Sequence, residues 1–207
     1  MKELKIRVTF TEPLLGTHPA DHELHTRFVA SKAPDHKTMA EEVAAHGVEE
    51  VEERGKTVFE KMDDGTPFLY SYMLNGYFKE TARAMKQVAG SETSKVKAFL
   101  KKIDNQIFVR GHLKGSPRII PLYMPIDMDL TETDNQRPLR ASTPMGERVA
   151  LAHSEEAPAG TYFECSVFCR IDSDVALVRE WLDEGIWKGI GQWRNAGFGL
   201  FEWEEIA

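Results

Sequence analysis

The most regular pattern in this chain lies between Phe163 and Ile171. Its apolar residues Phe163, Cys165, Val167, Cys169 and Ile171 alternate with Glu164, Ser166 and Arg170. Successive side chains of a strand point to opposite faces of a sheet, so this pattern predicts a half-buried β-strand. Residues 2–10 alternate in the same way, with Leu4, Ile6, Val8 and Phe10 on one side. Half-buried strands near both ends of the chain restrict it to folds that contain a sheet with a buried face.

Two segments with helical periodicity accompany these strands. Residues 71–89 carry an apolar stripe at helical spacing, formed by Leu74, Phe78, Ala82, Met85 and Val88. Ser71 is predicted to cap the start of this helix. A second helix is predicted from Asp172 to Glu184, with Asp172, Ser173 or Asp174 as its N-terminal cap and Gly185 at its C-terminal end.

The order of the elements predicts the fold class. Further strands are expected at residues 103–110, 118–124, 147–152 and 200–206. The order is then strand, helix, strands, strand, helix, strand, which is a split βαβ pattern. We therefore predict an α+β protein with a ferredoxin-like (RRM-like) βαββαβ core and inserted excursions.

The remaining residues are interpreted as insertions into a single domain that spans residues 1–207. One insertion lies around residues 17–64 and includes a short acidic helix expected at 38–53. The other lies around residues 125–146, where three prolines stand among polar residues and favour a long loop.

The charge of the chain is unevenly distributed. Its net charge is −7, which argues against a simple nucleic-acid binder. Residues 79–118 nevertheless hold ten basic and three acidic residues, whereas residues 41–64 hold nine acidic and three basic ones. A basic stretch of this kind gives an acidic protein a local positive surface, or else forms an ordinary solvated face. Composition leaves both interpretations open.

The sequence also indicates where the protein resides. No segment approaches the roughly 20 consecutive apolar residues that a membrane helix needs. The first ten residues lack the apolar core of a signal peptide. Cys165 and Cys169 would lie roughly 13 Å apart on one strand, too far for a disulfide bond. We therefore expect a cytoplasmic protein with reduced core thiols, no membrane contact and no cofactor.

A glycine-rich segment, residues 189–199, reads GIGQWRNAGFG. It follows a predicted helix and leads into the last strand, whereas a dinucleotide fingerprint follows a strand and opens a helix. Glycines permit positive φ and close approach of another backbone. Arg194, between Gly191 and Gly197, is placed to meet a phosphate to which exposed N–H groups also donate. A purely structural turn fits the spacing equally well.

Four segments resemble the RAMP superfamily, whose members form the backbone and the processing nuclease of CRISPR ribonucleoproteins. GIGQWRNAGFGLF resembles the family's C-terminal glycine-rich loop, and residues 64–83 resemble its entry to the first helix. Residues 157–164 are similar to the lead into the strand before the second helix, and TFTEPLLGTHP to the first strand and its exit. The second segment departs from the family pattern: Leu69 and Tyr70 replace the usual Pro-Gly, and Asn75 replaces the usual lysine.

The resemblance is stronger to the backbone subunits than to the processing nuclease. It implies a non-catalytic subunit of a CRISPR-type ribonucleoprotein that binds single-stranded guide RNA. Its partners would be that RNA and other subunits of the ribonucleoprotein, or copies of itself. The RNA-binding residues carried over by the resemblance are Ser71, Asn75, Lys79, Arg83, Arg137, Arg140, Gly189, Gly191, Trp193, Arg194, Gly197 and Gly199. No metal ligand is among them.

Two alternatives remain at this stage. The first is a metal-independent endoribonuclease that processes CRISPR RNA, with His18, His22 or His25 as general acid and base. Target cleavage is not expected, because residues 55–61 lack the aspartate that some backbone subunits use. The second alternative is a mimic or assembly protein that has this fold and acts through protein–protein contacts. The acidic segment 41–64 favours it a little.

Overall fold

The computed structural model describes residues 1–19, 56–132, 137–143 and 146–207. The chain folds into two compact units. The core unit contains residues 1–14, 60–129 and 157–207, and the second unit lies within residues 15–59 and 130–156. This division does not test the prediction of a single domain with two insertions, which stays a prediction.

The core unit is built on a four-stranded sheet. Its strands are β1 (Lys2–Phe10), β7 (Ile107–Gly111), β13 (Tyr162–Cys169) and β14 (Phe201–Glu205), and their order is β14-β1-β13-β7. Every neighbouring pair is antiparallel, with Val8 opposite Phe163 and Val167 opposite Val109. This order places the first strand beside the fourth and the third, as in a ferredoxin-like fold. The predicted α+β class and the ferredoxin-like core are therefore confirmed.

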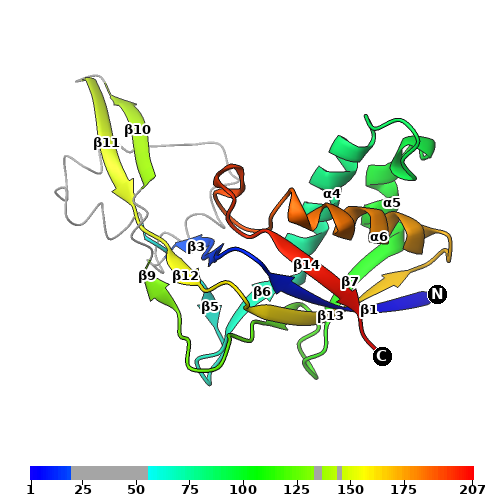
Figure 1. The fold of residues 1–207 in the computed structure, drawn as a ribbon, viewed down its shortest axis with the longest axis horizontal. Coiled ribbons are helices and arrows are strands. Elements are labelled where there is room, and N and C mark those ends of the chain that lie inside the picture. The colour runs from blue at the N-terminus through cyan, green and yellow to red at the C-terminus, as the bar shows by residue number, and fades with distance from the viewer. Residues whose placement is uncertain (20–55, 133–136, 144–145) are drawn as a thin grey trace. The chain divides into compact units, whose positions relative to one another are not determined.

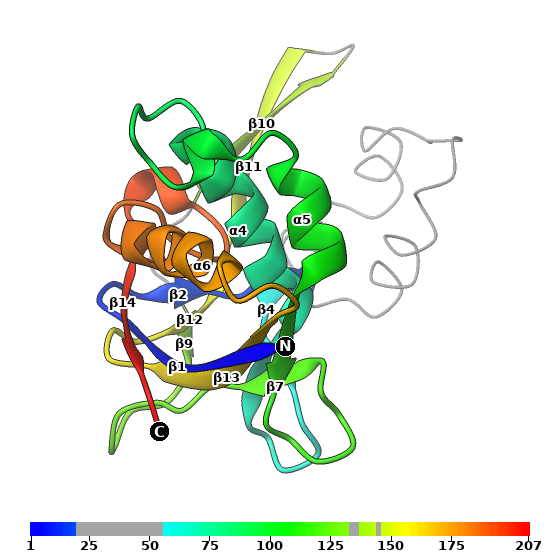
Figure 2. The same cartoon turned by 90° about the vertical axis from the view of Figure 1, so that its right-hand side faces the viewer.

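Three helices cover one face of this sheet (Figures 1 and 2). They are α4 (Ser71–Met85), α5 (Phe99–Gln106) and α6 (Asp174–Asp183). The apolar rows of the strands pack against the apolar stripes of these helices. Phe78, Trp181 and Phe201 are completely buried between the two layers. The Tyr77 hydroxyl donates a 2.7 Å hydrogen bond to the carbonyl of Trp181 and so joins α4 to α6. Cys165 and Cys169 are free thiols within this core.

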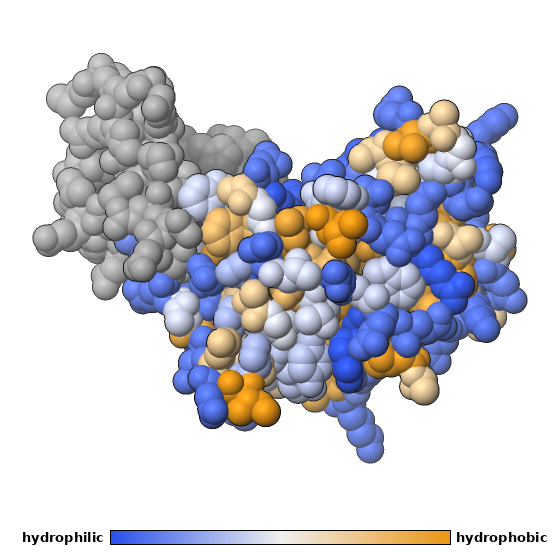
Figure 3. Space-filling model, in the orientation of Figure 1, coloured by the Kyte–Doolittle hydropathy of each residue, from blue (hydrophilic) through white to orange (hydrophobic). Residues whose placement is uncertain are grey.

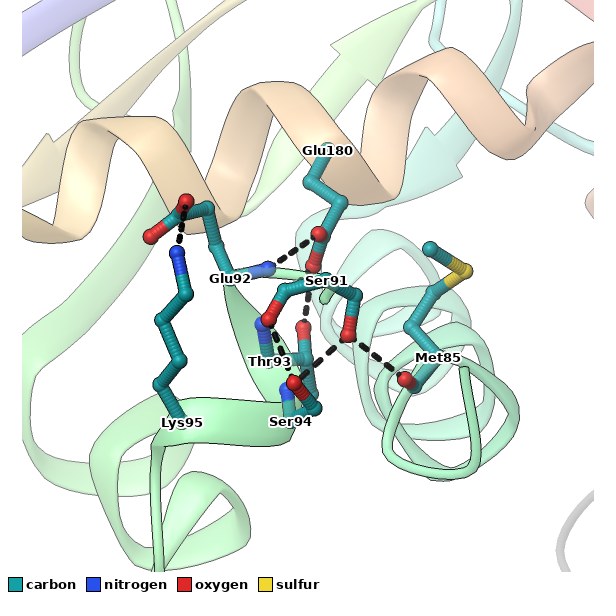
Figure 4. Close-up of polar contacts among 7 residues, drawn as sticks. All are labelled: Met85, Ser91, Glu92, Thr93, Ser94, Lys95 and Glu180. Atoms are coloured by element: carbon teal, nitrogen blue, oxygen red, sulfur yellow. Dashed lines mark hydrogen bonds and ion pairs between the residues drawn. The ribbon is translucent and has the colours of Figure 1, made fainter. Parts of the chain in front are cut away.

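A partly buried polar network fixes the segment after α4 against α6 (Figure 4). The 3₁₀ turn η1 (Thr93–Lys95) presents the N–H groups of Glu92 and Thr93 to the Glu180 carboxylate, at 2.5 and 2.9 Å. The Thr93 hydroxyl also donates to Glu180 and accepts from the Trp181 indole N–H at 2.7 Å. Glu180 therefore acts as a cap from a neighbouring helix, where η1 has no cap of its own.

Several element boundaries differ from those predicted. Helix α4 begins at Ser71, so its cap position falls on Tyr70 and the prediction of Ser71 as cap is wrong. The cause is that Tyr70 is held extended by pairing with Ile119. The helix ends at Met85, which leaves Val88 exposed. Residues 103–106 belong to α5 rather than to a strand.

The second predicted helix also differs at its ends. α6 begins at Asp174, and Ser173 stands at the cap position without a side-chain hydrogen bond. At the other end, Glu184 rather than Gly185 caps the helix, and the 3₁₀ turn η2 (Glu184–Ile186) follows. Gly185 lies under the ring of Phe201, where an added Cβ would meet ring carbon at 2.4 Å. Close packing is therefore the reason for glycine at this position.

The other strands form small sheets. One sheet in the core unit has the order β5-β6-β8, with β5 (Glu60–Lys61), β6 (Pro67–Tyr70) and β8 (Ile119–Pro121). Another has the order β2-β12-β9, with β2 (Leu14–Leu15), β12 (Glu155–Ala157) and β9 (Thr131–Glu132). Strands β3 (His18–Pro19) and β4 (Thr57–Val58) pair with each other.

Two further strands, β10 (Arg137–Thr143) and β11 (Gly146–Ala152), pair antiparallel with each other, with Arg140 opposite Val149. β11 was expected from the sequence, but β10 lies within a segment predicted as loop. Its apolar alternation is confined to Leu139 and Ala141, and Pro138 and Pro144 favour a loop, so the sequence did not predict this strand. The acidic helix expected at 38–53 lies outside the described residues. Among those described, no helix has the length and apolar character that a membrane span requires.

Candidate nucleic-acid interface

The glycine-rich segment is a loop closed at its neck by contact between two backbones. The N–H of Ile190 donates to the carbonyl of Gly199 at 2.9 Å. A Cβ at Gly199 would lie 2.0 Å from the Ile190 carbonyl oxygen, and one at Gly189 would lie 2.3 Å from that of Phe198. Glycine is needed at both positions because the two ends of the loop leave no room for a side chain.

Inside this neck the chain turns tightly around a pair of aromatic rings. Trp193 and Phe198 stack with their ring centroids 5.4 Å apart and their planes 3° from parallel. Trp193 has a left-handed backbone, with φ 53°, and the 3₁₀ turn η3 (Arg194–Ala196) follows it. Gly191 and Gly197 also have positive φ, 90° and 93°. Trp193, one of the predicted RNA-binding residues, therefore stacks on another ring of the same loop.

The loop is attached to α4 by two ion pairs that share one carboxylate. Arg194 and Lys188 both pair with Glu80 of α4, the lysine at 3.1 Å. Partial burial opposes ionisation of Glu80, but hydrogen bonds from the two cations outweigh it and hold its pKa below the ordinary value. Arg194 is thus positioned by the protein itself, with a third of its side chain exposed.

The predicted residues of α4 have different environments. Lys79 pairs with Asp104 of α5 at 2.5 Å. Ser71 is buried, and its N–H donates to the Arg118 carbonyl at 2.8 Å, so this donor is already used. The side-chain oxygen of Asn75 is buried and has no hydrogen-bond partner among the described residues. Arg83 is exposed, and within the described part of the chain no ion pair involves it.

The structure does not gather all the predicted residues. Arg137 and Arg140 lie in β10, but their side chains are outside the described part. His18 lies in β3 and is half-buried, whereas His22 and His25 fall outside the described residues. The described residues contain no cluster of His, Cys, Asp and Glu that could hold a metal ion. The part of the candidate interface whose side chains the structure describes is therefore α4 with the glycine-rich loop.

The basic stretch at 79–118 is only partly available. Lys95 and Lys102 pair with Glu92 and Asp174, and Lys86 donates to two backbone carbonyls. Its exposed cations without an ion pair among the described residues are Arg83, Lys97, Lys101, Arg110, Lys114 and Arg118.

Arg110 lies on β7, beside two aromatic residues that the sequence analysis missed, Phe108 and Phe168. Each stands in the polar row of its strand, and an apolar residue out of phase is the signal that identifies them.

Comparison with known proteins identifies the fold. No family model matches the chain, and no curated protein matches it. It is similar to a chain in the structure of the Type III-B Cmr-beta complex bound to cognate target RNA, with a TM-score of 0.51 and 9% identity. That match covers 100% of this chain and 60% of the other, so this chain spans well under two thirds of its neighbour. A chain of a Type IV-B CRISPR complex matches with a TM-score of 0.46 and 11% identity, over 100% and 91% of the two chains. The first likeness shows that this fold occurs in a CRISPR complex.

Proposed function

We propose that this protein belongs to the RAMP superfamily and is a non-catalytic subunit of a CRISPR-type ribonucleoprotein that binds single-stranded guide RNA. The observation that carries the proposal is the glycine-rich loop, which lies between α6 and β14 and is attached to α4 through Glu80. The sequence resemblance gives this loop and this helix the RNA-binding role. The fold that the protein shares with a chain of an RNA-bound CRISPR complex supports the assignment.

The proposed RNA contacts can be ranked by whether each cation already has an ion-pair partner. Arg83 is the strongest candidate because it is exposed and has no ion pair within the described residues. Arg194 and Lys79 are already paired with Glu80 and Asp104. To bind RNA, each must either leave its carboxylate for a phosphate or contact both groups at once. Arg137 and Arg140 of β10 complete the proposed contacts, and other subunits or further copies of the chain are its proposed protein partners.

The test is binding of the purified chain to a labelled single-stranded RNA of about 30 nucleotides across a salt series. Each phosphate that a cation neutralises contributes about −0.7 to the slope of log affinity against log salt. We expect a steep negative slope and full-length RNA after incubation. Absence of binding at low salt refutes the proposal, and RNA shortening without added metal supports the endoribonuclease instead.

One observation favours an assembly protein as the second candidate. Two of the cations assigned to RNA, Lys79 and Arg194, already have carboxylate partners, which is the arrangement of a structural surface. Figure 3 shows the hydrophobic residues of the described chain as separate spots among hydrophilic ones on the face in view. A protein partner on this face would therefore be recognised mainly through polar contacts. Tight binding to a CRISPR complex with no affinity for free RNA would establish this role.

A further inference from the structure

The four-stranded sheet has a second face, opposite to α4, α5 and α6. None of the helices in the described part of the chain covers it (Figure 2). Phe108 of β7 and Phe168 of β13 are direct neighbours in the register and share this face, because Val109 and Val167 point into the core. Both phenylalanines are half-buried. Two aromatic rings therefore stand side by side on a sheet surface that the core does not use.

Two arginines flank these rings. Arg110 follows Phe108 on the same face of β7 and is exposed. The guanidinium of Arg170 lies 5.3 Å from the centre of the Phe108 ring, a cation–π geometry. Neither arginine has an ion pair with another described residue. We call Phe108, Phe168, Arg110 and Arg170 the sheet patch.

Elsewhere on this face the cations of β1 already have partners, since Lys5 Nζ donates to the Ala207 carbonyl at 3.2 Å. Arg7 of β1 pairs with Glu164 at 2.7 Å and with Glu204 at 3.3 Å. The β14 side carries Glu202 in addition. Positive charge without an internal partner is therefore concentrated at the β7–β13 side, and the β14 side is acidic.

Three hydrogen-bonded residues border the patch. The Ser166 hydroxyl donates to Glu3 at 2.7 Å, and His112 Nε2 lies 3.0 Å from the same oxygen. Because that hydroxyl has a single hydrogen, Nε2 must donate to it. Glu3 is thus a carboxylate that borders the patch, and a hydrogen bond already satisfies part of its acceptor capacity.

We propose that the sheet patch is a subsite for unpaired bases of single-stranded RNA. The two half-buried rings lie side by side and offer stacking surfaces, one of them with the Arg170 guanidinium over it, and every nucleobase has a face that can stack. Arg110 and Arg170 supply the charge that complements the phosphates on either side of a stacked base. The acidic β14 side directs the strand over β7 and β13. This subsite lies on the face opposite to α4, so it is distinct from the interface proposed above, although both require that the protein binds RNA.

The test uses the full chain and two labelled 12-nucleotide RNAs, oligoadenylate and oligouridylate. The variant Phe108→Leu/Phe168→Leu removes the rings and keeps apolar side chains, and Phe99→Leu on α5 is the matched control on the other face. Loss of stacking predicts affinity weakened about tenfold or more, from about 1–3 kcal/mol per stacked base. Arg110→Gln/Arg170→Gln is expected to make the slope of log affinity against log salt less negative by about 1.4, because each of two phosphate contacts contributes about 0.7. Circular dichroism verifies that each variant is folded.

A second measurement localises the RNA. Photo-cross-linking with oligouridylate that contains 4-thiouridine is expected to label peptides of residues 107–112 and 162–170 but not residues 201–205. Cross-links confined to α4 and the glycine-rich loop, with full affinity in the leucine variant, overturn the subsite and leave the proposed function standing. No RNA binding by the wild type overturns both. Unchanged RNA affinity with lost binding to a CRISPR subunit shows that the face docks protein and also overturns the subsite.

Discussion

The glycine-rich loop and the sheet face opposite to α4, α5 and α6 differ in whether their arginines have carboxylate partners. The loop carries the motif that resembles an RNA-binding family, yet its arginine is held by Glu80 and its two rings stack on each other. The sheet face carries no motif, yet two of its arginines have no carboxylate partner among the described residues, and two half-buried rings lie side by side on it. A sequence motif can therefore mark a segment whose side chains already bond within the protein. Cations without a carboxylate partner mark where a ligand can gain new contacts.

The largest effect is expected from Gly199→Ala, which tests whether the loop is a fixed structure. A Cβ there would overlap the Ile190 carbonyl, and the backbone has φ 71°. We expect a loss of about 3 kcal/mol in unfolding free energy, from clash and left-handed strain together. Gly197→Ala is the matched control, since its φ is 93° but no atom lies within 4 Å of the new Cβ. It should cost about 1–2 kcal/mol, the left-handed penalty alone.

Urea denaturation measures both variants. Equal losses for Gly199→Ala and Gly197→Ala would show that the neck relaxes around a methyl group, and the loop would then be less rigid than this contact indicates. RNA affinity of the Gly199 variant adds a second result. If the loop shapes the interface, affinity falls, whereas binding at the sheet patch alone is insensitive to the substitution.

A somewhat smaller effect is expected from Thr93→Val, in the 3₁₀ turn η1 that packs against α6. Valine keeps the shape but leaves the Trp181 indole N–H buried without an acceptor and removes one donor to Glu180. Leaving such a group unsatisfied costs about 1–3 kcal/mol. Thr93→Ser restores the hydroxyl and should recover most of that loss. Equal destabilisation by serine and valine in urea denaturation contradicts the assigned role of the hydrogen bonds.

The sequence predicted the sheet and its main helices because each has a strong period. β1 and β13 alternate, and the stripe of Leu74, Phe78 and Ala82 is buried as expected. What it missed depends on contacts between distant residues. Glu80 sits on the solvent side of α4 in any helical projection, and only the fold brings Arg194 and Lys188 to it. Phe168 escaped notice because the alternation around it was otherwise regular, and its pairing with Phe108 is a property of register.

A modest effect is expected from Glu80→Gln, which releases the two cations of the loop. The ion pairs are partly exposed, so their contribution to stability is at most about 1 kcal/mol. Because the pKa of Glu80 is lowered from 4.5 in the folded chain, this contribution is present above pH 4.5 and is lost as the pH falls through the folded value. The wild type and the variant should therefore converge in stability at acid pH. A difference in unfolding free energy between the wild type and Glu80→Gln that persists at acid pH would show that the ion pairs are not its source.

The same variant discriminates between the two functions of the loop. If Arg194 contacts phosphate, removing its carboxylate partner makes it available, and RNA affinity should rise severalfold at low salt. An assembly surface that needs the docked loop predicts the opposite for its protein partner. Asp104→Asn, which frees Lys79 in the same way, is the companion variant for α4. RNA affinity unchanged in both variants would exclude both cations from the RNA interface.

The smallest effect is expected from single alanine substitutions at Arg83 and Arg194. Arg83 has no ion pair with a described residue, so Arg83→Ala should leave stability unchanged and reduce the salt dependence by about 0.7. Arg194→Ala should lower stability slightly and reduce the salt dependence by less, because its charge is already balanced by Glu80. Lys101→Ala, on the exposed side of α5, is the control cation. Equal slopes for Arg83→Ala and Lys101→Ala would mean that RNA meets a diffuse positive surface, and the specific role of α4 would be lost.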